Sequence, residues 1–148
     1  MFRYELRERI DRPPQAVFDF VGTRYLQNHP RWEPAVREVR QTTAGPLRPG
    51  ARTVMVRQDA GRVHEVPHEV VEFVPGRAFA MRTLGGLLGL SIAFATSPAG
   101  PSGTDLTVRV AVEPHGLLKL LQPLLALQMP RAGARMVRRI KELVEAEP

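Results

Sequence analysis

Hydrophobic and polar positions alternate along most of this chain with the period of a β-strand. In residues 2–10 the apolar side chains of Phe2, Tyr4 and Leu6 share one face, and charged side chains lie between them. This spacing is typical of a strand with one face in water. The same pattern predicts six further strands, at residues 35–43, 52–58, 62–74, 78–84, 88–97 and 104–112. Short turns such as 59–61 join them, so the strands form an antiparallel meander.

Helices are predicted at two places. The segment 11–14, with Pro13 and Pro14, ends the first strand and starts a helix, because proline is favoured in a first helical turn. A second short helical or irregular piece follows residues 22–23, and residues 29–34 are predicted to be a loop. The last third, 113–148, predicts one long helix whose apolar residues repeat every 3.6 positions.

The long helix changes character along its length. Leucines at residues 117–127 cover both sides, which indicates burial or contact with a second apolar body such as a ligand or subunit. The run is too short to span a bilayer and contains polar residues, so no stable membrane insertion is expected. Pro123 and Pro130 each interrupt the helical hydrogen bonds, and we expect a break or kink near one of them.

Composition and charge narrow the functional class. The chain of 148 residues has the size of a single domain, 1–148, and it has no cysteine, which excludes disulfides and thiol catalysis. The formal net charge is +6, but the arginines form no dense run, so a nucleic-acid partner is not expected. The N-terminal residues lack the apolar core of a signal peptide, which predicts a cytoplasmic protein.

The order of elements predicts an α+β helix-grip fold. One face of the sheet is wet, so the other must be covered, and only the C-terminal helix is long enough to cover it. About seven curved antiparallel strands, with two short helices after the first strand, would then wrap around that helix. One layer of side chains cannot fill such a shape, so we expect an interior cavity.

Several segments, taken in order, resemble one superfamily. They are residues 10–21, Trp32-Glu33-Pro34, 49–52, 69–77, 103–107 and 113–123. The chain resembles the START/Bet v 1-like (SRPBCC) superfamily, in particular its bacterial polyketide cyclase/dehydrase and lipid-transport-like branch. The resemblance implies the helix-grip fold and places Trp32 near the cavity mouth or packed under the short helices. It does not imply one reaction, because this scaffold hosts carriers, cyclases and protein-interaction domains.

His64-Glu65-Val66-Pro67-His68 matches the zinc-protease motif H-E-x-x-H, but its setting argues against that chemistry. The motif needs a helix to bring both histidines to one zinc ion. Residues 62–74 read as a strand, in which His64 and His68 are about 13 Å apart at roughly 3.3 Å per residue. No metal or cofactor is expected. The two histidines stay as weak catalytic candidates if their strand face lines the cavity, and adjacent Val70 and Val71 indicate that a bulge switches faces there.

We therefore predict that the protein binds a hydrophobic small molecule, such as a lipid, an isoprenoid or a polyketide-like ring system. The candidate cavity residues are Trp32, Val54, His68, Val70, Phe94, Val108, Leu118 and Leu121. A first alternative is a polyketide cyclase/aromatase-like or dehydratase-like enzyme that uses a cavity histidine or arginine. A second is a protein-interaction domain, including a homodimer, that uses the leucines of residues 117–127.

Overall fold

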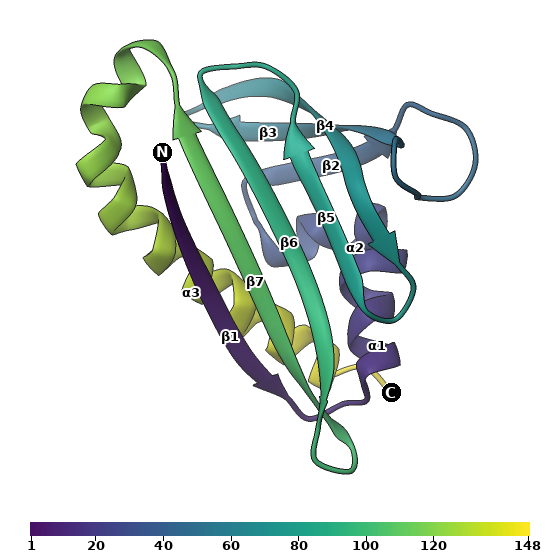
Figure 1. Cartoon of the computed structure of the whole chain (residues 1–148). Coiled ribbons are helices and arrows are strands. Elements are labelled where there is room, and N and C mark those ends of the chain that lie inside the picture. The colour runs from purple at the N-terminus through teal and green to yellow at the C-terminus, as the bar shows by residue number, and fades with distance from the viewer.

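A single curved sheet of seven antiparallel strands organises the computed structural model, which describes residues 1–148 (Figure 1). The strands lie in the order β1-β7-β6-β5-β4-β3-β2. Their bounds are Phe2–Ile10 (β1), Val36–Gln41 (β2), Arg52–Asp59 (β3), Arg62–Val74 (β4), Ala78–Thr83 (β5), Leu88–Ala99 (β6) and Gly103–Pro114 (β7). The first strand pairs with the last, so β1 and β7 run side by side.

The helices lie on one side of the sheet, and we call the sheet face that they cover the inner face. They are α1 (Pro14–Phe18), η1 (Asp19–Thr23), α2 (Tyr25–Trp32), η2 (Gly116–Leu121) and α3 (Gln122–Glu145). In Figure 1 the sheet is seen from its outer face; the first half of α3 lies beside β1, and its second half passes behind β1 and β7. The predicted helix-grip fold is confirmed.

The turn between β3 and β4 shows why these two strands form a hairpin. Asp59 pairs with Arg62, which leaves Ala60 and Gly61 as a two-residue loop with φ of 51° and 79°. Two successive positive φ values give a turn whose twist matches that of the flanking strands. Glycine adopts this conformation without the steric cost that a side chain brings.

A bulge in β4 changes the sheet face to which its side chains point, as predicted. The pairing with β5 shifts register between Val70 and Glu72, so Val71 is the extra residue. Val70 is buried and Val71 is exposed. The bulge lets both Val70 and Phe73 face inward although they are three positions apart.

One predicted loop is wrong, and two strands are longer than predicted. β6 and β7 pair as far as Ala99 and Gly103, beyond the predicted strands 88–97 and 104–112. Most of residues 29–34 belongs to α2, although Pro30 lies inside it. The proline removes one backbone donor, but the helix places Tyr25, His29 and Trp32 on one face, where all three are buried. Burial of this aromatic face outweighs the local signal of the proline.

The predicted break in the C-terminal helix lies at Pro123. The 3-10 turn η2 ends at Leu121 and α3 starts at Gln122, which places Pro123 in the first helical turn, where its missing N–H has no partner to lose. Pro130 is accommodated inside the helix. No helix is long and apolar enough to cross a membrane.

The second half of α3 provides the packing that holds the helix on the sheet. Its buried residues are Gly133, Val137, Ile140 and Val144, the stripe that the 3.6-residue spacing predicts. Gly133 allows the closest approach, because a Cβ there would lie 2.6 Å from Leu6 Cδ1. Each buried Val or Ile side chain stabilises the fold by about 1.5–3 kcal/mol.

Candidate functional site

Aromatic side chains of α2 form the centre of the inner side. Tyr25, His29 and Trp32 recur at the spacing of helical turns, so they share a face. The His29 and Trp32 rings stack with centroids 5.2 Å apart, and Tyr25 lies 5.1 Å from Phe79 of β5. Trp32 also meets Phe94 of β6 edge-on at 6.3 Å. This cluster fixes α2 against the sheet and leaves the polar atoms of its rings in a largely apolar setting.

A chain of hydrogen bonds runs from this cluster to the surface. His29 contacts the Tyr25 hydroxyl through Nδ1 at 2.8 Å and Glu33 through Nε2 at 2.7 Å. The second carboxylate oxygen of Glu33 accepts a hydrogen bond from Arg57 at 2.5 Å. Arg57 also donates to Asp59 at 3.0 Å, and Asp59 lies 2.7 Å from His64 Nε2. Side chains from α2, β3 and β4 therefore form one connected polar network.

Charge pairing keeps this network ionised. Burial alone would raise the pKa of Glu33, but the hydrogen bond and charge of His29, together with Arg57, outweigh it and lower that pKa to about 2. Burial and the charge of Glu33 both raise the pKa of Tyr25, so this phenol stays protonated. Burial and Glu33 also raise the pKa of Tyr4, on the other side of the inner space.

His68 is the buried histidine of β4, and its two ring nitrogens have different roles. Nδ1 lies 3.1 Å from the carbonyl oxygen of Val66, so it must carry the proton and donate it. Burial lowers the pKa of His68, and the nearby His29 and Arg57 act in the same direction. The neutral ring therefore keeps a lone pair on Nε2, which has no hydrogen-bond partner in the protein.

Two buried donors on the inner side also lack partners. They are the indole Nε1 of Trp32 and the hydroxyl of Thr53. Thr53 is paired directly with His68 across β3 and β4, and Trp32 stacks on His29. A buried polar atom without a partner costs free energy, about 1–3 kcal/mol. A carbonyl or hydroxyl group of a bound molecule would satisfy these atoms.

The inner face is packed at one end and half-open at the other. At the α2 end, Phe79, Phe94 and Val108 are buried. Towards η2 the apolar side chains of the inner face are only partly buried; they include Phe2, Tyr4, Leu6, Leu88, Leu90 and Ile92. Leu125 of α3 is likewise half-buried. Apolar surface is thus incompletely buried at this end of the molecule.

The structure brings together five of the eight residues predicted to line the cavity. Trp32, His68, Val70, Phe94 and Val108 are buried on the inner side. Val54 alternates with buried Thr53 and Met55 and so lies on the outer face of β3. Leu118 is half-buried and Leu121 is exposed, both in η2 at the half-open end. His64, the other histidine candidate, is exposed and bound to Asp59.

Three residues of the polar network, His29, Glu33 and Arg57, were missed from the sequence. Because residues 29–34 were predicted to be a loop, no contact was expected between His29 and Glu33. In the structure they are four residues apart on one helix face and form an i,i+4 pair. Arg57 meets Glu33 across 24 positions, a contact that no local pattern predicts. No group of three or more histidine, aspartate or glutamate side chains is placed to hold a metal ion.

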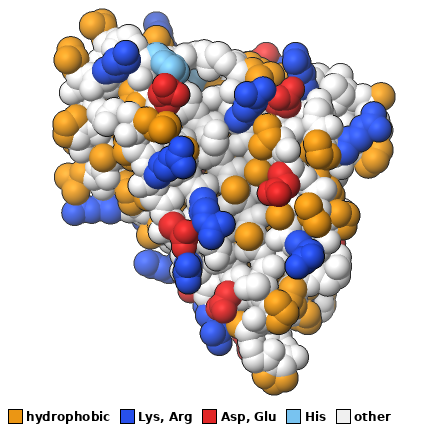
Figure 2. All heavy atoms as spheres, in the orientation of Figure 1, with side chains coloured by type: hydrophobic (Ala, Val, Ile, Leu, Met, Phe, Trp, Pro, Cys, Tyr) orange, Lys and Arg blue, Asp and Glu red, His pale blue; other side chains and the backbone are white.

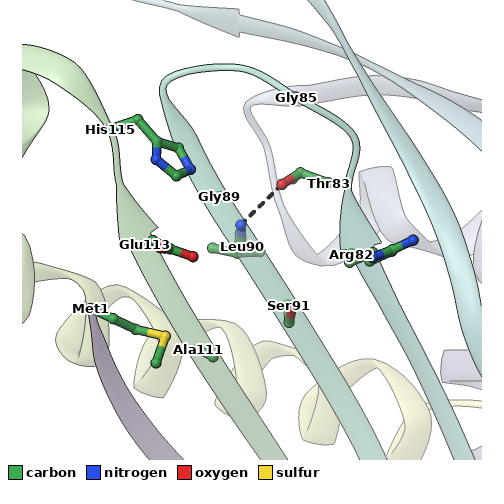
Figure 3. A pocket seen from close by; sticks show the side chains of 10 residues that line it. All are labelled: Met1, Arg82, Thr83, Gly85, Gly89, Leu90, Ser91, Ala111, Glu113 and His115. Carbon is green, nitrogen blue, oxygen red and sulfur yellow. Dashed lines mark hydrogen bonds between the residues drawn. The ribbon is translucent and has the colours of Figure 1, made fainter.

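Two open hollows lie on the outer face of the sheet, opposite α3. The larger, about 410 Å³, lies over small residues such as Ala80, Ala93 and Ala111. The smaller, about 230 Å³, is shown in Figure 3, where Arg82, Ser91 and other outer-face side chains lie in front of the sheet. Salt bridges such as Arg9–Asp105 (2.8 Å) and Arg109–Glu5 (3.0 Å) cover much of the remaining outer face.

The sequence matches one protein family over residues 1–145, described as polyketide cyclase / dehydrase and lipid transport. The chain belongs to this family. The START/Bet v 1-like resemblance is thereby confirmed. No curated protein matches the sequence.

Solved structures show how widely this fold is shared. TTHA0849 from Thermus thermophilus has 17% identity, covers 98% of each chain and has a TM-score of 0.79. Zhui aromatase/cyclase from Streptomyces sp. R1128 has 14% identity over 97% of this chain and 93% of that chain, with a TM-score of 0.78. Norcoclaurine synthase from Thalictrum flavum has 13% identity over 99% and 87%, with a TM-score of 0.71. At such identities the likeness is one of fold alone.

Proposed function

We propose that this protein binds a hydrophobic small molecule between the inner face of its sheet and the first half of α3. The observation that supports this most is the half-buried apolar side chains of Phe2, Leu88 and Leu90 on the inner face, at the end of the sheet where β7 leads into η2. Covering them with an apolar ligand would be favourable by about 25 cal/mol for each Å² removed from water. The family description, which includes lipid transport, supports a ligand of this class.

The polar atoms around His68 would fix the orientation of the ligand. Nε2 of His68 is able to accept a hydrogen bond from a ligand, whereas Trp32 Nε1 and the Thr53 hydroxyl are able to donate one. A ligand with a carbonyl or hydroxyl group at one end of an apolar body matches this set. A lipid, an isoprenoid or a polyketide-like ring system has this character.

A pair of substitutions on β6 tests the location. Ile92→Trp adds bulk at a half-buried position of the inner face, and Ser91→Trp places the same bulk on the outer face one residue away. The expected result is that the first variant binds a fluorescent fatty-acid probe at least about tenfold more weakly than the native protein, whereas the second does not. Native mass spectrometry of the purified protein gives a second readout. Equal binding by both variants, or loss in Ser91→Trp alone, would contradict an inner-face site.

A second candidate function, a cyclase-like or dehydratase-like enzyme, is favoured by one observation. His68 is neutral and buried, and its free Nε2 is suited to accept a proton from the carbon beside a carbonyl group. Tyr25, His29 and Glu33 form a connected polar path beside it. This hypothesis is tested with a polyketide-like β-ketone substrate: His68→Gln should lower turnover about a hundredfold or more, and exposed His64→Gln should not. Equal turnover of the two variants would leave binding as the function.

A further inference from the structure

The solvent side of η2 and α3 carries a continuous row of leucines followed by arginines. We call it the leucine–arginine stripe; it consists of Leu117, Leu120, Leu124, Leu127, Arg131, Arg135 and Arg138. From Leu124 onward the spacings of three and four residues keep these side chains on one face, opposite buried Gly133 and Val137. Leu117 and Leu120 are 83% and 79% exposed, far more than is usual for leucine in a folded domain. Figure 2 shows hydrophobic side chains gathered along this edge of the molecule.

The charge of this region is entirely positive. Residues 114–141 contain no aspartate or glutamate, but they contain Lys119, Arg131, Arg135, Arg138, Arg139 and Lys141. None of the arginines of the stripe forms a salt bridge, whereas outer-face arginines such as Arg9, Arg82 and Arg109 each pair with a carboxylate. Unpaired guanidinium groups beside protruding leucines are suited to a partner that is both apolar and anionic.

We propose that the leucine–arginine stripe docks the protein onto the surface of an anionic lipid bilayer. Protruding apolar side chains enter the interface of a bilayer, and neighbouring cations are attracted to anionic lipids. Leu117 and Leu120 would enter that layer, and Arg131 and Arg135 would contact lipid phosphates. This interaction is independent of ligand binding at the inner face.

Other occupants fit the stripe less well. A second copy of the chain could cover the leucines but would leave the arginines without a partner, because the stripe has no carboxylate to pair with them. A nucleic acid would meet the arginines but leave the leucines uncovered. A bilayer surface satisfies both halves of the stripe at once.

Vesicle co-sedimentation tests this proposal with the full-length chain. We expect binding to vesicles of phosphatidylcholine with phosphatidylglycerol and little binding to vesicles of phosphatidylcholine alone. Because the attraction is partly electrostatic, native binding should fall as NaCl is raised from about 0.05 M to about 0.5 M. Leu117→Ser/Leu120→Ser should weaken binding at least about tenfold, and Arg131→Gln/Arg135→Gln about thirtyfold.

The matched control removes the same charge elsewhere. Arg62→Gln/Arg77→Gln changes two exposed arginines in turns and strand ends away from α3 and should leave vesicle binding within about twofold of the native value. Circular dichroism confirms that each variant is folded. Failure to bind anionic vesicles, or equal loss in the control, would overturn the proposal. So would light scattering that shows a dimer abolished by Leu117→Ser/Leu120→Ser without any vesicle binding, because the occupant would then be a second copy.

Discussion

The two halves of α3 belong to the same helix but have different surroundings. In the second half Val137, Ile140 and Val144 are buried, and polar contacts hold the end in place. Lys141 donates to the Arg9 carbonyl oxygen at 2.5 Å, and Glu145 accepts from the Asp11 amide at 2.8 Å. In the first half Leu124 and Leu127 are exposed, and the start of the helix is tied by one bond, from the Met1 amino group to Gln122 at 3.2 Å.

We infer that this difference separates stability from ligand binding within one element. The second half, with α1 and α2, closes a core that has little free surface. The first half presents leucines to solvent, near apolar residues of the inner face that are only partly buried. Local opening costs the least free energy where side chains are loosely packed. We expect a ligand to enter there and the other half to act as a rigid base.

The largest expected effect comes from truncating one side chain in each half of α3. Ile140→Ala removes fully buried atoms and should lower the free energy of unfolding by about 3 kcal/mol. Leu124→Ala, in the exposed half, should cost less than about 1 kcal/mol. Urea titration followed by circular dichroism measures both. A similar cost at the two positions would mean that the halves are equally packed.

The second-largest loss of stability is expected from removing an ion pair at the end of the inner face that α2 covers. Glu33→Gln leaves Arg57 with Asp59 alone and should cost about 2 kcal/mol at pH 7. The control Glu38→Gln removes an exposed partner of Arg40 and should cost less than about 1 kcal/mol.

The contribution of Glu33 to the free energy of unfolding should change with pH in a definite direction. The pKa of Glu33 falls from 4.5 to about 2 on folding, so its contribution is present above pH 4.5 and is lost as the pH falls towards 2. Unfolding measured across this window should therefore show a smaller pH dependence in Glu33→Gln than in the native protein. An unchanged dependence would show that other carboxylates dominate acid unfolding.

A smaller effect is expected where the two halves of α3 meet. Gly133→Ala gains about 1 kcal/mol of helix propensity, but its Cβ would lie 2.6 Å from Leu6 Cδ1 and must displace it. We expect a net loss of about 1 kcal/mol. In the background of Leu6→Ala the closest obstruction is gone and Tyr4 Cε2 at 3.3 Å remains, so the same substitution should stabilise by up to about 1 kcal/mol. Chemical denaturation of the four proteins in this cycle measures the coupling, and additivity would contradict the predicted contact.

Most of the fold could be predicted from the sequence, because its signals are periodic and local. The alternation in residues 62–74 predicted β4 with both bounds correct, and the adjacent valines indicated its bulge. The stripe of Val137, Ile140 and Val144 follows from the 3.6-residue repeat. The second half of α2, from His29, was predicted as a loop because Pro30 favours a loop locally, whereas the packing of Trp32 and Tyr25 decides the structure.

The candidate site was less predictable, because it depends on contacts between distant segments. His68 could be found as a histidine in a valine-rich strand, but its burial depends on the register with Thr53 of β3. The bond between Arg57 and Glu33 needs the positions of both α2 and β3. Val54 is apolar, as a residue that lines a cavity would be, yet the pleat of β3 turns its side chain to the outer face.

The smallest expected effect comes from the burial of His68, one of the two histidines of β4. The pKa of His68 is lowered by burial, so the unfolded chain binds a proton more readily than the folded one. Stability should therefore fall as the pH drops below the ordinary histidine value of 6.5. His68→Gln should reduce this fall in denaturant titrations between pH 7 and pH 5, whereas His64→Gln should lack this effect of burial because His64 is exposed. If the two variants behave alike, then His68 is accessible to water in the free protein, and the half-open space reaches further towards α2 than its burial indicates.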